Sequence, residues 1–586
     1  MIRRKKLLYT LLALALFVPW GVIPVNAQLD ATPELSFDLW VLSWDDISVD
    51  TGTGIRTLLG DVGIEINVVI KDDDPMYEGI FQEPRQFIMY EMSHGYGSVP
   101  DHVWYRMDSE NIIDWGDNPY GLNNATVDAA LDNFMTSTPS EMAANARLVQ
   151  IYAKQNIPYI PLFLSDDTHA IRAEWTNYSI KPGGPFTSYN PATMIFMYDD
   201  TWTSGDMPFV MSYSSDIGEL NPLFYRSERS HWYDMLIYDT LLSYDENLDP
   251  IPWLAEDYAV SADGTTVNFT IRSGVEWHDG SPLTADDVAF TFNYQKSAPE
   301  DAVYWSFLQH MVSATAYGDV VSVVMDDSYS FALQTLGGEL YILPKHIWEG
   351  IEANDERWDD PANVTAHIGS GPFKYVARTP DEFTQMERFD NWWGPTSPYI
   401  GQLPSITEVR IDVIRSQDAR ILAMRSGEAD TERYEVFGAY VNTILNAPEL
   451  HLVTGVASQW DYVLGFNMTI PGLDDLTVRH AISLAMNRQY LVNVGRLGFG
   501  TITNSTIPAT FFPSYYSPDG AFVEDVDLAN QILDDAGYLD IDNDGVREFP
   551  GVAPPGGGVD IVLILGIGAG ALIVGVLITY FALKKK

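Results

Sequence analysis

The 586-residue chain is too long for a single hydrophobic core, so two or three domains are expected. Its 81 acidic and 33 basic residues give a formal net charge of −48, which disfavours nucleic-acid binding because phosphates require Lys and Arg. The absence of cysteine excludes disulfides, thiol catalysis and zinc-thiolate sites, while a hydrophobic content of 46% argues against disorder.

The N-terminus has the pattern of a secretory signal peptide. Basic residues at positions 3–6 precede the apolar run 7–18, and Val25 and Ala27 supply the small residues of a cleavage site. We therefore expect residues 1–27 to be a signal peptide, cleaved so that the mature chain begins near Gln28.

Residues 35–186 have the alternating pattern of an α/β fold. LSFDLWVLSW at 35–44 predicts a strand, and GIRTLLGDVGIEINVVI at 54–70 predicts a helix followed by another strand. Two further motifs follow in this part of the chain, MSHGYGSVPDHVW at 92–104 and QNIPYIPLF at 155–163.

The segment 253–292 predicts a hairpin that leads into a capped helix. Asp263 and Gly264 supply a turn, and apolar residues then alternate with polar ones over 267–272, the period of a half-buried strand. Thr284 followed three residues later by Asp287 predicts a capping box at the start of a helix. This segment resembles the signature region of the family 5 extracellular solute-binding proteins, which are dipeptide and oligopeptide receptors of ABC importers.

Further motifs extend the resemblance along the chain. They are residues 217–258, ILPKHIW at 342–348, GSGPF at 369–373, residues 389–406, SGEAD at 426–430 and residues 466–488. The resemblance implies a two-lobed, periplasmic-binding-protein-like (type II) α/β fold with mixed sheets and a hinge. It also implies a receptor that closes on an oligopeptide or similar solute and delivers it to ABC permease subunits with a separate ATPase.

The order of these motifs predicts a circular permutation. The family's pattern begins at residue 207 and breaks off at 550, and residues 35–200 supply its missing last part without duplication. Such relocation is tolerated when old and new termini are close at the surface. The alternatives are a fusion of two truncated receptors and a rearranged gene.

The predicted domains are 28–200 (the family's C-terminal portion, in the second lobe and returning to the first), a 201–206 linker, 207–375 (first lobe) and 376–550 (second lobe with return strands).

The 92–104 motif is the best candidate for ligand binding. In peptide-binding family members an acidic residue follows the aromatic here and anchors the ligand's α-amine, but this chain has Ser98 and Val99 before Pro100. The departure argues against free-amine peptides and raises oligosaccharides as an alternative ligand. The candidate ligand contacts, with Tyr96, Trp104 and Trp460 as stacking platforms, are Tyr96, Asp101, Trp104, Asn221, Trp460 and Tyr462.

Residues 540–545 form a DxDxDG sequence, the first half of a calcium loop. The twelfth position, where an EF-hand places a bidentate Glu, is Gly551 here, although Glu548 stands at position nine. The candidate ligands are Asp540, Asp542, Asp544 and Glu548, and the alternative is an acidic turn. No other cofactor is expected.

The C-terminus has the pattern of a membrane anchor. After a Pro/Gly tether at 551–558, an uncharged apolar run predicts a transmembrane helix over 559–583. The Lys tail 584–586 predicts a cytoplasmic C-terminus and therefore a single-pass protein of the cell membrane with an extracellular body. A secreted chain held in this way, without a lipidated cysteine, resembles archaeal surface receptors more than bacterial lipoproteins.

Export permits N-glycosylation at six Asn-x-Ser/Thr sequons, Asn124, Asn177, Asn268, Asn363, Asn467 and Asn504. No hydrolase or nucleotide-binding motif of the HExxH, GxSxG or GxxxxGK[ST] type occurs in the sequence, so a binding protein is favoured over an enzyme. A secreted hydrolase and a structural cell-surface protein remain as alternative classes.

Overall fold

The computed structural model describes residues 34–551, apart from short gaps at 44, 167, 180, 182–183, 188–189, 225–227, 300–301, 434–435, 437–438 and 455–456. The predicted signal peptide, transmembrane helix and cytoplasmic tail lie outside the described residues, as does the tether beyond Gly551. Within the described part of the chain, no helix is both long enough and apolar enough to cross a bilayer.

The first lobe contains a mixed seven-stranded sheet. Its strands, in spatial order, are β15 (Phe373–Thr379), β16 (Phe383–Arg388), β17 (Glu408–Val413), β8 (Pro208–Tyr213), β18 (Thr431–Glu432), β5 (His169–Arg172) and β19 (Leu450–Val453). β8 pairs in parallel with β17 and β18, and β5 pairs antiparallel with β18 and β19. The lobe therefore takes one strand from the N-terminal part of the chain and the others from residues 208–453.

The same lobe carries a second, antiparallel sheet around the predicted hairpin. Its strands, in order, are β11 (Ala255–Val260), β12 (Thr266–Ile271), β14 (Val320–Met325) and β13 (Met311–Tyr317). Gly264 adopts φ +73° at the turn, and alternate residues of β12 are buried, so the predicted hairpin is confirmed. The predicted capping box is also present, because Thr284 and Asp287 exchange hydrogen bonds at the start of α8 (Ala285–Lys296).

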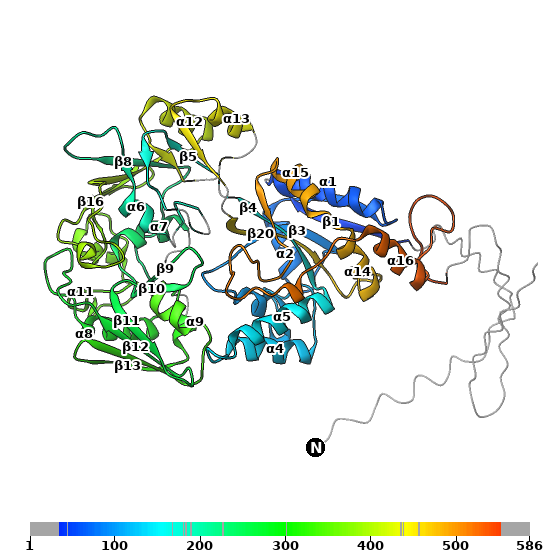
Figure 1. Cartoon of the computed structure of the whole chain (residues 1–586), viewed down its shortest axis with the longest axis horizontal. Helices are drawn as coiled ribbons and strands as arrows, with labels where there is room; N and C mark the ends of the chain where they lie inside the picture. The colour runs from blue at the N-terminus through cyan, green and yellow to red at the C-terminus, as the bar shows by residue number, and fades with distance from the viewer. Residues whose placement is uncertain are drawn as a thin grey trace, which may run out of the picture.

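The second lobe is built on a six-stranded sheet. Its strands, in spatial order, are β2 (Glu65–Lys71), β1 (Ser36–Leu42), β3 (Met89–Gly95), β20 (Ala457–Phe466), β4 (Tyr159–Asp166) and β21 (Gly500–Ile502). β1 is parallel to β2 and β3, whereas β20 is antiparallel to β3 and β4. Strands from the two ends of the described chain thus interleave in one sheet, and Figure 1 shows the blue and orange segments together in the right-hand lobe.

Helices cover both faces of this sheet because successive side chains of a strand point to opposite faces. Leu39 and Val41 of β1 pack in one core with α1 (Asp46–Gly60), α14 (Leu476–Ala485), α15 (Arg488–Arg496) and α16 (Val526–Ala536). Trp40 and Leu42 pack in the other core with α2 (Asp73–Phe81), α3 (His102–Met107), α4 (Ala125–Met135) and α5 (Met142–Asn156). The apolar side chains of Val478, Ala481, Ile482 and Ala485 on α14 belong to the first of these cores.

The remaining elements are short. The strands are β6 (Trp175–Thr176), β7 (Tyr198–Asp199), β9 (Leu242–Tyr244) and β10 (Pro250–Pro252). The α-helices are α6 (Ala192–Phe196), α7 (Glu228–Ile237), α9 (Trp305–Leu308), α10 (Ala332–Gln334), α11 (Lys345–Trp348), α12 (Gln417–Ser426) and α13 (Ala439–Leu445). Single turns are η1 (Ser109–Asn111), η2 (Thr335–Glu339, a π-turn), η3 (Glu356–Trp358), η4 (Val364–His367), η5 (Gly394–Thr396) and η6 (Pro518–Gly520).

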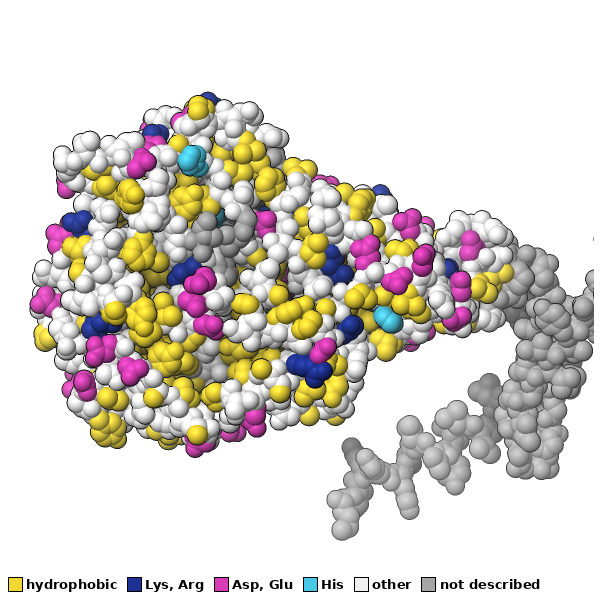
Figure 2. Space-filling view, viewed as in Figure 1, with side chains coloured by type: hydrophobic (Ala, Val, Ile, Leu, Met, Phe, Trp, Pro, Cys, Tyr) yellow, Lys and Arg dark blue, Asp and Glu magenta, His cyan; other side chains and the backbone are white. Residues whose placement is uncertain are grey.

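The chain crosses between the sheets of the two lobes from β4 to β5 and again from β19 to β20. The second crossing comes later than the predicted boundary at 375/376, because β15, β16 and β17 extend the sheet of β8. Acidic side chains are scattered over both lobes on the face seen in Figure 2.

Candidate ligand-binding site

Hydrogen bonds also connect the two lobes directly. At the end of α4, Ser330 donates its backbone N–H to the Met135 carbonyl (2.9 Å), and the Ser137 N–H donates to the Ser330 hydroxyl (2.7 Å). The Gln334 side chain also donates to the Tyr515 hydroxyl at 2.9 Å. Because these bonds join residues of different lobes, the two lobes are in direct contact in addition to the two crossings.

On the second-lobe side, a cavity of about 230 Å³ lies between the end of β3 and α3. Its lining includes His94, Gly97, Asp101, Arg106 and Asp117. Burial lowers the pKa of His94 well below its ordinary value and raises that of Asp117. The imidazole is therefore neutral, and acids dominate the ionisable groups that line the cavity.

The basic group of this cavity, Arg106, is already paired. Its guanidinium donates two hydrogen bonds to the Asp461 carboxylate, at 3.0 and 3.2 Å, and both side chains are almost fully buried. A buried pair of this kind neutralises itself, and removal of either partner leaves an uncompensated charge. Arg106 therefore positions the β20 end rather than offering a free positive charge to a ligand.

Asp101 is the notable acid of the cavity. Its pKa is raised from 3.8 to about 7, chiefly by burial and also by the nearby Glu339 carboxylate, while hydrogen bonds and Arg106 act in the opposite direction. A carboxylate with this pKa is held in an environment that disfavours its negative charge. A cation placed beside it would be strongly favoured.

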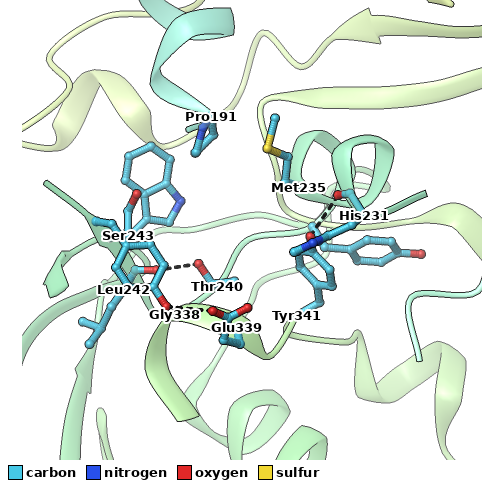
Figure 3. A pocket seen from close by; sticks show the side chains of 12 residues that line it. Pro191, His231, Met235, Thr240, Leu242, Ser243, Gly338, Glu339 and Tyr341 are labelled. Carbon is cyan, nitrogen blue, oxygen red and sulfur yellow. Dashed lines mark hydrogen bonds between the residues drawn. The ribbon is translucent and has the colours of Figure 1, made fainter. Parts of the chain in front are cut away.

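Glu339 reaches the same region from the first lobe, at the end of the η2 turn. Its carboxylate accepts a hydrogen bond from the Tyr244 hydroxyl at 3.2 Å, and the Ser98 and Tyr304 hydroxyls lie close enough to act on its pKa. Figure 3 shows it in a small pocket of about 30 Å³, near Thr240 and Tyr341. Burial raises the pKa of Glu339 despite these three hydroxyls.

The η2 turn that presents Glu339 depends on a glycine. A Cβ on Gly338 would lie 2.2 Å from the Tyr244 hydroxyl oxygen, far inside van der Waals contact. The absence of a side chain at this position therefore lets Tyr244 approach the turn and bond Glu339.

Glu339 bears on the prediction that the 92–104 motif lacks an acid for a ligand amine. The sequence has no acid between Tyr96 and Pro100, but the structure brings the Glu339 carboxylate near the Ser98 hydroxyl in that gap. An acid from the other lobe thus occupies the region that the sequence leaves neutral. No local signal could have identified it, because the two residues are 241 positions apart in the sequence.

Of the six candidate contacts, Asp101, Trp104 and Trp460 have exposed or partly exposed side chains. Trp460 is 44% exposed and pairs with Gly95 across the β3–β20 ladder, and Trp104 is half-buried against Tyr105. Asp101 lines the cavity. These three remain candidates for contact with a ligand.

The other three candidates are structural. The Tyr96 ring is buried among His102, Phe511 and Phe512. Tyr462 stacks on Phe163 in the core, and its hydroxyl donates to Asp45.

Asn221 is also buried, and its amide is engaged on both sides. The side-chain nitrogen donates to the Ala353 carbonyl, and the oxygen accepts the Leu223 N–H. Packing and local hydrogen bonds thus already engage Tyr96, Tyr462 and Asn221, and their predicted part in ligand binding stays a prediction.

One predicted glycosylation site is also contradicted. Asn467 is 4% exposed, and its side-chain nitrogen donates to the Phe87 carbonyl, so the fold has no room for a glycan there. The other five sequon asparagines are exposed or partly exposed.

Two α/β lobes joined by two crossings, with ionisable groups from both lobes between them, define a solute-binding protein of the two-lobed class. Residues 249–565, more than half of the chain, match the sequence profile of the bacterial extracellular solute-binding proteins, family 5 (middle). The chain therefore belongs to the family 5 solute-binding proteins.

Curated relatives are similar over part of their length. The probable peptide-binding protein YejA of Agrobacterium fabrum is 30% identical over 225 residues, covering 38% of this chain and 36% of that protein. The oligopeptide-binding protein AppA of Bacillus subtilis is 27% identical over 349 residues, covering 57% of this chain and 61% of that protein. The chain thus spans about a third to three fifths of the length of these relatives.

Solved structures are similar at lower identity. AppA of Bacillus subtilis in complex with a nonapeptide has a TM-score of 0.41 and 23% identity, covering 59% of this chain and 67% of that one. The mannohexaose-bound oligopeptide-binding protein of Thermotoga maritima has a TM-score of 0.41 and 22% identity, covering 59% and 64%.

Proposed function

We propose that this protein is the membrane-tethered receptor of an ABC importer and that it captures an oligopeptide by closure of its two lobes. Family membership supports a binding role, and the peptide-binding relatives support the ligand class. The permease and its ATPase are separate subunits in this proposal. The predicted signal peptide and C-terminal helix place the body outside the cell membrane.

The observation that carries the ligand assignment is that the Glu339 carboxylate of the first lobe lies near enough to Asp101 of the second lobe to raise its pKa. Burial raises the pKa of both acids, and the nearest basic group of the cavity, Arg106, is bonded to Asp461. A ligand ammonium group bound there would pair with the carboxylates and offset their desolvation. The proposed ligand is therefore a peptide with a free amino terminus or a lysine side chain at this position. This differs from the expectation drawn from the missing acid before Pro100.

The test compares free and N-acetylated forms of the same peptides by calorimetry. A peptide library screen supplies the binders. Acetylation should weaken binding at least tenfold, corresponding to about 1.4 kcal/mol, because it removes the ammonium charge. Glu339→Gln should reduce this difference, whereas Glu382→Gln, a change of an exposed acid in the first lobe, should preserve it. Equal affinity of both forms for the wild-type protein would contradict the assignment.

An oligosaccharide is the second candidate ligand, and the exposure of Trp460 favours it. A 44% exposed indole beside Gly95 offers an apolar face on which a sugar ring can stack. If sugars are the ligands, Trp460→Ala should abolish binding of mannohexaose, while Glu339→Gln should leave it nearly unchanged. Binding of neutral glycans with no peptide binder in the same screen would favour this alternative.

We also propose that the chain order is a circular permutation of the family's order. Glu34 forms an antiparallel bridge with Glu548, and the Leu35 N–H donates to the Arg547 carbonyl at 2.8 Å. The two ends that the family order would join are thus adjacent in the second lobe, and residues 199–206 form the exposed connection between β7 and β8. Two separate globules are not seen, because β1, β3, β4 and β20 share a sheet.

A gene rearranged into the family's order tests the proposed permutation. A chain in which 207–550 is followed directly by 35–200 should fold with the same circular dichroism spectrum and bind the same peptides. A chain that expresses only as aggregates in this order, while the native order folds, would refute the proposed relationship.

A further inference from the structure

The DxDxDG loop meets the opposite end of the folded chain. Glu548 forms isolated antiparallel bridges with both Leu539 and Glu34, so that the loop 540–547 closes on the segment just before β1. Figure 1 shows this loop, after α16, at the end of the second lobe that faces away from the first lobe. It is separate from the ligand-binding site.

This closure brings together acids that are distant in the sequence. Glu34, Asp542 and Asp544 each offer a carboxylate oxygen, and these oxygens all lie within 4.8 Å of one another. Calcium binds oxygens at about 2.3–2.6 Å, so two ligands of one ion are separated by at most about 5 Å. The three oxygens are therefore close enough to share one ion.

A second, independent observation is a buried acid beside this group. Glu548 is 1% exposed, and one of its carboxylate oxygens accepts the Ile541 N–H at 2.8 Å, whereas the other has no hydrogen-bond partner. Residues directly opposite in an antiparallel bridge point to the same face, so the side chains of Glu548 and Glu34 lie on the same side of the strands. An unpartnered buried carboxylate oxygen is costly unless a cation or donor satisfies it.

The preceding residue, Arg547, does not pair with the unpartnered carboxylate oxygen of Glu548. Arg547 donates to the Val62 carbonyl, the Asp534 carboxylate, the Tyr538 carbonyl and the Asn530 side chain. Its guanidinium is therefore directed to the body of the lobe, and none of these bonds involves the acids of the loop.

We propose that Glu34, Asp542, Asp544 and Glu548, with Asp540, form a calcium site that clamps the start of the folded chain to its end. Glu34 supplies from the other end of the chain the carboxylate that the loop lacks at Gly551. Oxygen-only ligands with several carboxylates are the set that Ca²⁺ prefers, whereas Mg²⁺ demands a stricter octahedral arrangement. The ion would stabilise the second lobe and would not enter the ligand cleft.

The test is a Ca²⁺ titration of the full-length protein after treatment with EDTA. Equilibrium dialysis with ⁴⁵Ca²⁺ should show one specific site, and the melting temperature should rise with Ca²⁺ and much less with Mg²⁺. Glu34→Gln should weaken Ca²⁺ binding at least tenfold, and Asp542→Asn with Asp544→Asn should abolish it. Asp73→Asn with Asp74→Asn, which alters an acidic run at α2, should behave as wild type.

Glu34→Gln is the decisive variant because it leaves the DxDxDG loop intact. Wild-type affinity in this variant would refute the clamp, and so would absence of a specific site in the wild type. Should the double Asn variant fail to fold, Glu34→Gln and the dialysis of the wild-type protein still decide the matter. Peptide binding tests the proposed function separately, since the two sites lie at opposite ends of the second lobe.

Discussion

Replacement of Asp101 by Asn should remove a specific pH dependence of stability. The folded-state pKa of Asp101 is about 7, whereas the ordinary value is 3.8. Because the folded state binds the proton more tightly, the stability that Asp101 contributes is fully present below pH 3.8 and is lost as the pH rises through 7. The difference between the two values corresponds to about 4 kcal/mol.

The measurement is urea-induced unfolding of the ligand-free protein at pH 4, 6 and 8. Asn cannot ionise, so the free energy of unfolding of wild type minus that of Asp101→Asn should fall by about 4 kcal/mol between pH 4 and pH 8. Any pH-independent effect of the Asn amide on stability cancels, because only the change of this free-energy difference with pH is interpreted. Asp257→Asn, at an exposed position of β11, is the control and should follow the wild-type profile.

A difference between wild type and Asp101→Asn that varies by less than about 1 kcal/mol over this range would refute the reasoning. It would mean that Asp101 is solvated in the folded protein and that the cavity does not disfavour its charge. The proposed recognition of an ammonium group would then lose its main electrostatic basis.

Three further predictions follow from the contacts described above. Small-angle scattering should show a smaller radius of gyration with a bound peptide than without it, and a tight binder without compaction would contradict lobe closure. Gly369→Ala should destabilise the protein by roughly 1–3 kcal/mol in urea unfolding, because the new Cβ would lie 1.9 Å from the Ile237 carbonyl oxygen. Ser330→Ala should weaken peptide binding by about 1 kcal/mol, chiefly through faster dissociation in stopped-flow kinetics, because it removes the acceptor of the Ser137 N–H. An unchanged dissociation rate in Ser330→Ala would mean that this bond does not hold the closed lobes.

The elements that the sequence predicts well depend on neighbours in the chain. The β11–β12 hairpin follows from the alternation at 267–272 and from a glycine at φ +73°, and the start of α8 follows from Thr284 and Asp287. The two glycines of the GSGPF motif lie against the carbonyls of Leu236 and Ile237, where a Cβ would collide. The hairpin and the start of α8 each depend only on a few neighbouring residues, so the local sequence is enough to predict them.

The features that the sequence missed depend on contacts across hundreds of residues. An alternating strand such as β15 fits either sheet, so the sequence could not show that β15 to β17 extend the sheet of β8. The sequence predicts Tyr462 as a ligand contact, but in space its ring stacks on Phe163 and its hydroxyl bonds Asp45, within the core. Glu339 gave no signal at all, because its role comes from Ser98 and Asp101 in the other lobe.

In the function proposed above, the placement of Asp101 and Glu339 in different lobes ties recognition of the ligand to lobe closure. When the lobes meet without a ligand, two carboxylates are desolvated near each other, and the raised pKa of each expresses that cost. A cationic ligand group therefore binds between the two carboxylates more tightly in the closed form. In the open form water already solvates both acids, so the cation adds little stabilisation. A ligand shifts a two-state equilibrium only by its differential affinity for the two states, so a few kcal/mol of electrostatic relief can change the ratio of closed to open protein by a factor of about 100 to 1,000. The expected consequence is that Asp101→Asn with Glu339→Gln closes more readily without ligand and discriminates less between charged and acetylated peptides. Scattering of the ligand-free double variant measures the first effect, and an expanded form like that of the wild type would show that the acids do not control closure.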